Sequence, residues 1–256
     1  MEKINISVVG ALGRMGRILI KIINTKKDLK LYSLTDASTG KSINNIKIQS
    51  NNLKAFINTD VIIDFSSPEG SLQVIALAVK LKKNVIVGTT GFTENQNQII
   101  LKASKKIAIF KSGNMSLGIN ILEYIAKIAA KKIPSNYYIS ITDNHHKKKI
   151  DYPSGTALML AGAIAKGKNK KLKSLIGKSS FKKKVMTNNK INFFITRKGS
   201  TIGKHSIEFN NNIEKIELKH DALSRELFAN GAINAAVWIR KKRSGLFSMQ
   251  DMLNLK

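Results

Sequence analysis

Two adjacent histidines and a nearby lysine form the segment of this chain best equipped for acid–base chemistry: His145, His146 and Lys149. Histidine gains and loses a proton near neutral pH. A lysine crowded by Lys147 and Lys148 gives up its proton more readily than an isolated one. These residue types predict a site that delivers a proton to a reacting atom.

A turn that could hold a carboxylate follows within ten residues. Ser154, Gly155 and Thr156 precede an apolar stretch with helical spacing, and the first N–H groups of a helix are donors for an anion. The simpler alternatives are an N-cap by Ser154 and a solvated basic loop. A metal site fits less well, because the paired histidines lack a convincing set of carboxylate or cysteine partners. Together the two segments favour a site for a small anionic acid.

A glycine-rich turn near the N-terminus predicts a dinucleotide site. Gly10, Gly13 and Gly16 follow the apolar run 4–9 and open a helical pattern, where glycine allows a tight turn and close approach to a pyrophosphate. Asp36 ends the next apolar run, where an acid can bind ribose hydroxyls. Glycines also serve ordinary turns, but the strand, helix and acid around this pattern favour the cofactor interpretation.

Two further loops follow short apolar runs, as ligand-binding loops do in open α/β sheets. The first is Gly88-Thr89-Thr90-Gly91-Phe92, and the second, a weaker signal, is Ser112-Gly113-Asn114-Met115. The alternative for both is a plain strand-to-helix connection. We expect them to face the cofactor because they belong to the same edge of the fold as the glycine turn.

Short buried strands alternate with helices up to about residue 116, which predicts a Rossmann-like parallel sheet. Beyond it the pattern predicts a mixed α/β domain with an open antiparallel sheet. Its strands are expected at 137–142, 191–196, 205–209 and 215–220, with a loop at 168–190. We therefore predict a dinucleotide-binding domain of residues 1–116, rejoined by 224–256, and a substrate-binding and oligomerisation domain of residues 117–223.

The composition bounds the class of protein. The 256 residues include no cysteine, which excludes disulfides and fits a reducing cytoplasm, and no apolar run is long enough to cross a bilayer. The net charge of +28 would attract nucleic acid, but only six of the 44 basic residues are Arg and aromatic residues make up 6%. We therefore expect a cytoplasmic protein with no specific nucleic-acid partner and no membrane partner.

The segment from His145 to Ala157, with the glycine turn and the Gly88–Phe92 loop, closely resembles the 4-hydroxy-tetrahydrodipicolinate reductases. This family, also called dihydrodipicolinate reductases, acts in the diaminopimelate route to lysine, and the likeness covers nearly the whole chain. The resemblance implies hydride transfer from NADH or NADPH to C4 of a cyclic unsaturated dicarboxylic acid, with a proton delivered to the neighbouring ring carbon. It also implies a homotetramer.

The resemblance assigns roles residue by residue. His145 is expected to be the proton donor and acceptor and Lys149 the proton donor, while His146, Gly155 and Thr156 would hold the substrate carboxylates. The cofactor would be bound by Gly10, Ala11, Leu12, Gly13, Arg14, Met15, Asp36, Gly88, Thr89, Thr90, Ser112, Gly113, Asn114 and Met115. No metal is expected.

Two single residues and one longer stretch depart from the family's pattern. Ala37 stands where members that use NADPH well often have Arg, so NADH is expected to be favoured, although Lys41 could reach a 2′-phosphate. Met115 replaces a more usual Phe. The stretch 174–192 is shorter and lacks the family's Arg- and Gly-rich pattern.

Two rival functions share parts of this pattern. Another amino-acid dehydrogenase could have the same nucleotide domain, since fold alone does not fix function. A non-catalytic NAD(H)-binding sensor is the second, but a sensor has no use for paired proton donors. The His145–Thr156 segment therefore favours the reductase over both.

Overall fold

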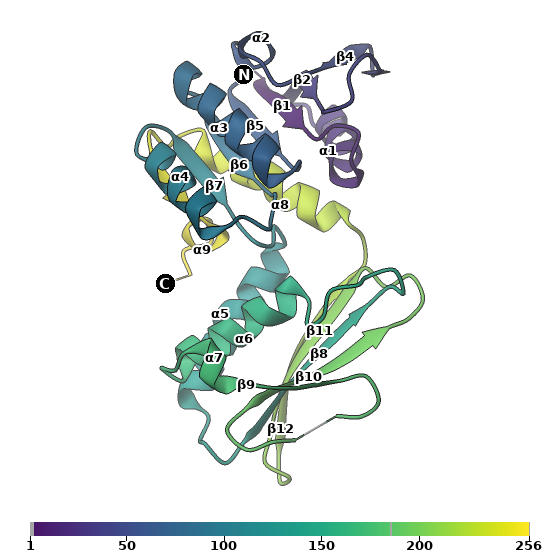
Figure 1. Ribbon diagram of the computed structural model, residues 1–256, viewed down its shortest axis with the longest axis vertical. Coiled ribbons are helices and arrows are strands. Elements are labelled where there is room, and N and C mark those ends of the chain that lie inside the picture. The colour runs from purple at the N-terminus through teal and green to yellow at the C-terminus, as the bar shows by residue number, and fades with distance from the viewer. Residues whose placement is uncertain (1–2, 185, 256) are drawn as a thin grey trace. The chain divides into compact units, whose positions relative to one another are not determined.

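The computed structural model describes residues 3–184 and 186–255, which form two compact units (Figure 1). Unit 1 runs to Ser116 and resumes at Arg225, and unit 2 spans Leu117–Ser224. The first expected boundary, after residue 116, agrees with these units. The second was expected after residue 223 and lies one residue later, after Ser224. No helix in the described ranges combines the length and apolarity that a membrane crossing requires.

Unit 1 contains a mainly parallel sheet, as the alternation of strands and helices predicts. Its strand order is β13-β7-β6-β5-β1-β2-β4-β3, and only β3 and β4 pair antiparallel. The strands are β1 (Ile4–Val9), β2 (Leu29–Thr35), β3 (Ser42–Ile43), β4 (Ile46–Gln49), β5 (Val61–Asp64), β6 (Asn84–Val87), β7 (Ala108–Lys111) and β13 (Gly245–Phe247).

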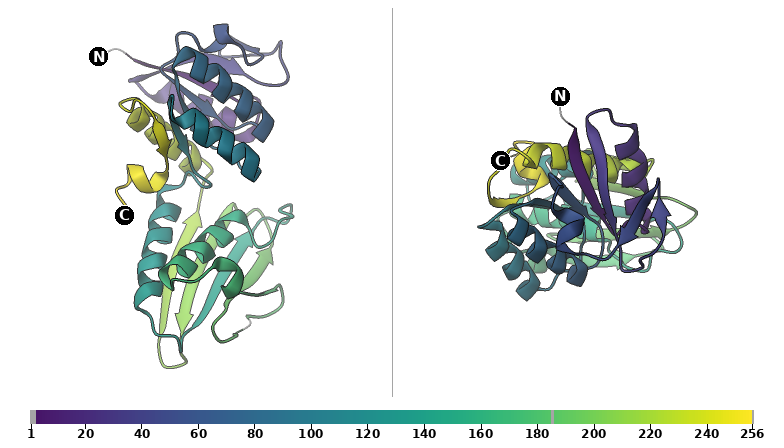
Figure 2. Two further views of the ribbon diagram at one scale, coloured as in Figure 1. Left: turned by 60° about the vertical axis from the view of Figure 1, so that its left-hand side comes forward. Right: turned by 90° about the horizontal axis from the view of Figure 1, so that it is seen from above.

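Helices cover both faces of this sheet, with α3 and α4 on one face and α1 and α8 on the other (Figure 2). The helices of unit 1 are α1 (Arg14–Thr25), α2 (Leu53–Phe56), α3 (Pro68–Leu81), α4 (Glu94–Ser104), α8 (Glu226–Ile239) and α9 (Met249–Met252). Apolar side chains of α3, such as Val74 and Ala78, pack on Ile62 and Val85 of the strands. Burial on both faces explains why these strands are continuous apolar runs rather than alternating ones.

Helix α8 brings the C-terminal segment against a loop of unit 1. Gly231 lies in the middle of this helix, and a Cβ atom there would stand 1.7 Å from the carbonyl oxygen of Met115. Only glycine allows this approach. The close packing therefore ties α8 to the Ser112–Met115 loop.

Unit 2 is a mixed sheet with α5 (Leu117–Lys132) and α6 (Gly155–Gly167) packed on one face. The strand order is β12-β11-β8-β10-β9, and Ile141, Phe193 and Phe209 are buried beneath the helices. The remaining elements are α7 (Leu172–Leu175), β8 (Tyr138–His145), β9 (Ile176–Ser180), β10 (Ile191–Arg197), β11 (Gly203–Asn210) and β12 (Lys215–Ala222).

Two expectations for unit 2 are wrong. Strand β10 pairs parallel to β8, not antiparallel, because α6 crosses between them and a helical crossover returns the chain in the same direction. The stretch 168–190 is not all loop: it contains α7 and β9, and β9 forms the sheet edge beside β10. Polar, lysine-rich residues on an exposed edge strand hide the usual strand pattern.

Candidate active site

A cluster of polar side chains lies at one end of the unit 2 sheet, on the face that the helices cover. It follows the buried apolar side chains of the same face. Alternate residues of β8 share this face, so buried Ile139 and Ile141 are followed by Asp143 and His145. The register places His205 of β11 opposite Asp143 and Arg197 of β10 opposite His145. Three strands therefore bring two histidines, an arginine and an aspartate together.

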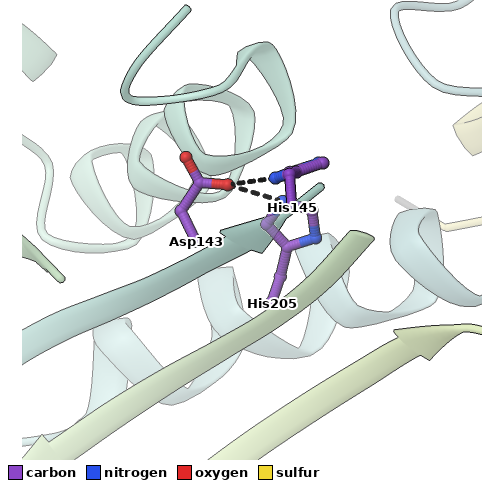
Figure 3. Close-up of side chains that lie close together, drawn as sticks. All are labelled: Asp143, His145 and His205. Carbon is purple, nitrogen blue, oxygen red and sulfur yellow. Dashed lines mark ion pairs between the residues drawn. The ribbon is translucent and has the colours of Figure 1, made fainter. Parts of the chain in front are cut away.

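Asp143 is the centre of this cluster. Its Oδ1 lies 2.8 Å from Nδ1 of His145 and 3.4 Å from Nε2 of His205 (Figure 3). Its Oδ2 accepts hydrogen bonds from the Arg197 guanidinium at 3.1 Å and from the backbone N–H of Ser154 at 2.7 Å. The carboxylate is completely buried and yet surrounded by donors, so it stays ionised.

The electrostatics of the cluster follow from these contacts. Burial alone would raise the pKa of Asp143, but hydrogen bonds from His145, His205 and Ser154 outweigh it and hold the pKa far below its usual range. Burial lowers the pKa of His205, and the nearby His145 and Lys149 add to this despite the opposing effect of Asp143. His205 is therefore neutral at pH 7.

The same contacts set the orientation of the His145 ring. With Nδ1 directed at the carboxylate, Nε2 is the ring nitrogen that does not contact Asp143. Nε2 lies beside Gly203, where a Cβ atom would stand 3.2 Å from it. The contact between Asp143 and His145 thus fixes the orientation of the imidazole ring.

Lys149 is held near this cluster by an ion pair. Its Nζ lies 2.8 Å from Oδ1 of Asp151, and the backbone carbonyl of Asp151 accepts a hydrogen bond from Arg197 at 2.8 Å. The Lys149 side chain is about a quarter exposed. The ion pair therefore restrains the Lys149 side chain next to Asp151.

The loop that carries His146 is fastened to the loop after β10. The backbone N–H of His146 donates to Thr201 at 2.7 Å, and Lys147 donates to Gly199 at 3.3 Å. The N–H of Lys198 donates to His145 at 2.9 Å. These three bonds tie the basic loop to the loop that follows β10.

Helix α6 begins beside the cluster. Ser154 is its N-cap: the Oγ accepts a hydrogen bond from Ala157 and lies 3.2 Å from Nε2 of His205. Gly155 and Thr156 form the first turn of the helix. The capping expectation is confirmed, and the expected binding of a carboxylate by Gly155 and Thr156 stays a prediction.

Asp143, His145 and His205 place three possible metal-ligand atoms within 4.8 Å of one another. The chemistry of the surroundings does not suit a cation. Arg197 already compensates the carboxylate, and Nδ1 of His145 and Nε2 of His205 both lie within ion-pair distance of its Oδ1. We therefore interpret the group as a cluster of paired polar and charged side chains and not as a metal site.

In unit 1, the glycine turn has the shape that a dinucleotide requires. Gly10 has φ of +74°, and a Cβ there would lie 2.4 Å from the Phe65 carbonyl oxygen. Gly16 permits the close approach of α1, since its Cβ would stand 2.1 Å from the Gly10 carbonyl oxygen. Asp36 reaches back to the turn, where its Oδ2 accepts the N–H of Leu12 at 2.9 Å. The turn and the acid fit a pyrophosphate and a ribose.

The two other predicted cofactor loops lie together in unit 1. A hollow of about 190 Å³ is lined by Thr89, Thr90, Gly91, Phe92, Asn97, Lys111, Ser112 and Gly113. The Thr89 hydroxyl accepts a hydrogen bond from the N–H of Ser66 at 3.0 Å, which joins this edge to the end of β5. The structure thus brings these loops to one edge, while Asn114 and Met115 lie just beyond the hollow's lining.

Both halves of the chain match models of one family. Residues 4–115 match the model described as dihydrodipicolinate reductase, N-terminus, and residues 118–253 match dihydrodipicolinate reductase, C-terminus. The chain belongs to the dihydrodipicolinate reductase family.

Relatives support the same family over the full length. The chain is 46% identical to the 4-hydroxy-tetrahydrodipicolinate reductase of Pelagibacter ubique, with all of both chains covered. It is 41% identical to that of Buchnera aphidicola subsp. Cinara cedri, covering 98% of this chain and 97% of the relative. The fold is similar to a dipicolinate-bound dihydrodipicolinate reductase from Paenisporosarcina sp. TG-14, with a TM-score of 0.80, 21% identity, and 98% and 99% coverage.

Reasoning from the sequence missed Asp143, Arg197 and His205, which form the cluster around His145. Asp143 carried a usable signal, because a residue two positions before His145 on a strand shares its face. His205 and Arg197 are distant in sequence, and only the strand register places them beside His145.

Proposed function

We propose that this dihydrodipicolinate reductase family member uses His145 and Lys149 to deliver the proton in the reduction of 4-hydroxy-tetrahydrodipicolinate. The C4 hydroxyl group and a proton from the neighbouring ring carbon leave as water, a hydride then joins C4, and a proton returns to the neighbouring ring carbon. The product, tetrahydrodipicolinate, belongs to the diaminopimelate route to lysine. The observation that carries the proposal is the 2.8 Å contact between Asp143 and Nδ1 of His145, which leaves Nε2 for proton transfer.

The substrate is a dicarboxylate, so the site needs two anion-binding elements. The first is the start of α6, where Gly155 and Thr156 present backbone donors and the helix dipole favours negative charge. The second is cationic, and His146 on the fastened basic loop is assigned to it. Lys149, held by Asp151, is assigned as the ammonium that donates a proton.

The cofactor is a nicotinamide dinucleotide, which supplies the hydride when bound. We assign its pyrophosphate to the turn from Gly10 to Met15 and its ribose to Asp36. The loops Gly88–Thr90 and Ser112–Met115 are assigned to the remaining contacts. We propose that NADH is favoured, because Ala37 is exposed and offers no charge to a 2′-phosphate. The homotetramer and the cytoplasmic location stay predictions from the sequence.

The first experiment mixes the purified chain with freshly generated 4-hydroxy-tetrahydrodipicolinate and follows the absorbance of NADH and NADPH in parallel. Oxidation of either cofactor is the expected result. Bound cofactor without oxidation would favour the non-catalytic sensor instead.

A second experiment tests the residue roles. His145→Gln and Lys149→Met should each lower kcat about 10²- to 10⁴-fold while the Kd for NADH stays within about twofold. Lys148→Met, on the same loop but exposed, is the matched control and should keep most activity. Near-unchanged kcat in the first two variants would refute the assigned roles without refuting the reductase.

A further inference from the structure

A basic hollow lies at the edge of the unit 1 sheet opposite the glycine turn. It has a volume of about 420 Å³ and gathers six cationic side chains: Lys82, Lys83, Lys106, Arg240, Lys242 and Arg243. These residues adjoin the amino-terminal ends of β6 and β7, whereas the glycine turn follows the carboxyl end of β1. The hollow is therefore separate from the dinucleotide site.

The cations of the hollow have no carboxylate partner. Across residues 3–184 and 186–255, no ion pair joins any of the six to an acid. The one carboxylate in the lining is Asp60, whose Oδ2 accepts the backbone N–H of Asn5 at 2.7 Å. Five formal positive charges therefore remain in excess within one hollow.

The ordinary explanation for such residues is compensation of helix dipoles. Helices α3, α4 and α8 all end at this edge, and each helix end carries about half a negative charge. Three ends supply about 1.5 negative charges in all. This is well below the excess of five, so dipole compensation accounts for a minority of the cations.

The Asn84 side chain, which lines the hollow, joins three segments of the chain by hydrogen bonds. Asn84 donates from Nδ2 to the carbonyl oxygens of Ile239 and Lys242, both at 3.1 Å, and its Oδ1 accepts the N–H of Ala108 at 3.1 Å. These bonds lock the end of α8 to the starts of β6 and β7. The Lys242 ammonium also lies 4.5 Å above the Trp238 ring. The backbone that carries the basic residues at the end of α8 is thus held to the sheet by three hydrogen bonds.

We propose that this hollow binds a compact oligophosphate, either free or as the triphosphate of a nucleotide. Lysine ammonium groups act as point charges toward phosphate, and the two arginines can each bind phosphate oxygens through paired N–H groups. The volume suits a small anion. A multiply charged anion is favoured because it neutralises several of the unpaired cations at once.

The test is calorimetric titration of tripolyphosphate into the full chain saturated with NADH, so that the dinucleotide site is filled. One saturable site per chain is expected, with affinity that falls as ionic strength rises. Lys106→Gln/Arg243→Gln should weaken binding about tenfold or more. Both residues are exposed and make no ion pair, so the fold should be retained.

The matched control is Lys131→Gln/Lys132→Gln, which removes the same charge from exposed residues at the end of another helix, α5. Its affinity for tripolyphosphate should stay within about twofold. Equal weakening in both double variants, or no saturable site in the unaltered chain, would overturn the proposal.

Titrations with ATP and with adenosine test whether the phosphate groups are what the hollow recognises. ATP should bind with an affinity similar to that of tripolyphosphate, and adenosine should not bind at all. Binding of adenosine at this site would contradict the phosphate-based recognition.

Discussion

Asp143 and His145 stand two residues apart on β8, with Oδ1 of the acid 2.8 Å from Nδ1 of the imidazole. Because side chains two positions apart share one face of a strand, the backbone itself brings the pair together. The same carboxylate also binds Arg197 and the start of α6. One buried charge therefore contacts both His145, the proposed proton donor, and the start of α6, the proposed binding site of a substrate carboxylate.

Asp143→Asn should lower kcat about 10²- to 10⁴-fold. The amide has nearly the same shape, but its NH₂ group cannot accept the bonds that two donors now make to the acid. The His145 tautomer and ring orientation would no longer be fixed. Steady-state kinetics check this, and Asp28→Asn, an exposed position in unit 1, serves as the control. Similar kcat values for both variants would show that the Asp143–His145 contact has no part in catalysis.

The contribution of His205 and His220 to the stability of the protein should fall as the pH drops below about 6.5. Burial lowers the pKa of His205, and burial together with His205 lowers that of His220. The unfolded chain then binds protons that the folded chain does not, so folding is favoured above this pH and loses stability below it. Thermal unfolding from pH 8 to 5 measures the slope. His205→Gln should reduce the slope without abolishing it, because His220 remains; an unchanged slope would contradict the assignment.

Asp64 should have the opposite pH dependence. It is completely buried, and burial raises its pKa to about 6 in spite of hydrogen bonds from Ser66 and Ser71. The folded chain holds this proton more tightly than the unfolded chain, so stability from this group is present below about pH 4 and is lost as the pH rises to 6.

The size of this effect can be measured in Asp64→Asn, which cannot ionise. Relative to the unaltered chain, the variant should gain up to about 3 kcal/mol of unfolding free energy between pH 4 and pH 7. Denaturant unfolding at both pH values checks this. A constant difference between the two proteins would mean that Asp64 has an ordinary pKa.

Ala37→Arg should shift cofactor preference toward NADPH. The position directly follows Asp36 and is exposed, so a guanidinium there can pair with a 2′-phosphate without disturbing the core. We expect the ratio of kcat/KM for NADPH to that for NADH to rise about tenfold. Lys41→Gln, made in the chain that keeps Ala37, tests the alternative partner of the 2′-phosphate. If this substitution abolishes the use of NADPH, Lys41 already supplies the phosphate contact.

Local pattern was sufficient to predict most of the elements that position these sites. The alternation of short strands and helices up to about residue 116 is confirmed, and the turn that begins at Gly10 lies between β1 and α1 as the pattern predicts. Strand direction in unit 2 could not be obtained in this way. A short alternating strand has the same pattern whichever direction its neighbour runs, so β10 was expected in the wrong orientation.

The candidate site residues that the sequence predicts are those that lie close together along the chain. His145, His146, Lys149 and the start of α6 lie within one segment of the chain. The partners that hold them, Arg197 and His205, depend on pairing between strands more than fifty residues apart. Ile-rich strands carry little information on register beyond their two-residue alternation.

The order of the chain has a consequence for synthesis on the ribosome. Unit 1 is interrupted after Ser116 and resumes at Arg225, and the late segment supplies α8 and the edge strand β13. Until that segment emerges, α1 lacks the helix packed beside it and β7 lacks its outer neighbour. Unit 2 is contiguous and can complete its core first. The nascent protein therefore finishes its second unit before its first, and the first stays open to chaperones or to misassembly until residues 225–256 are made.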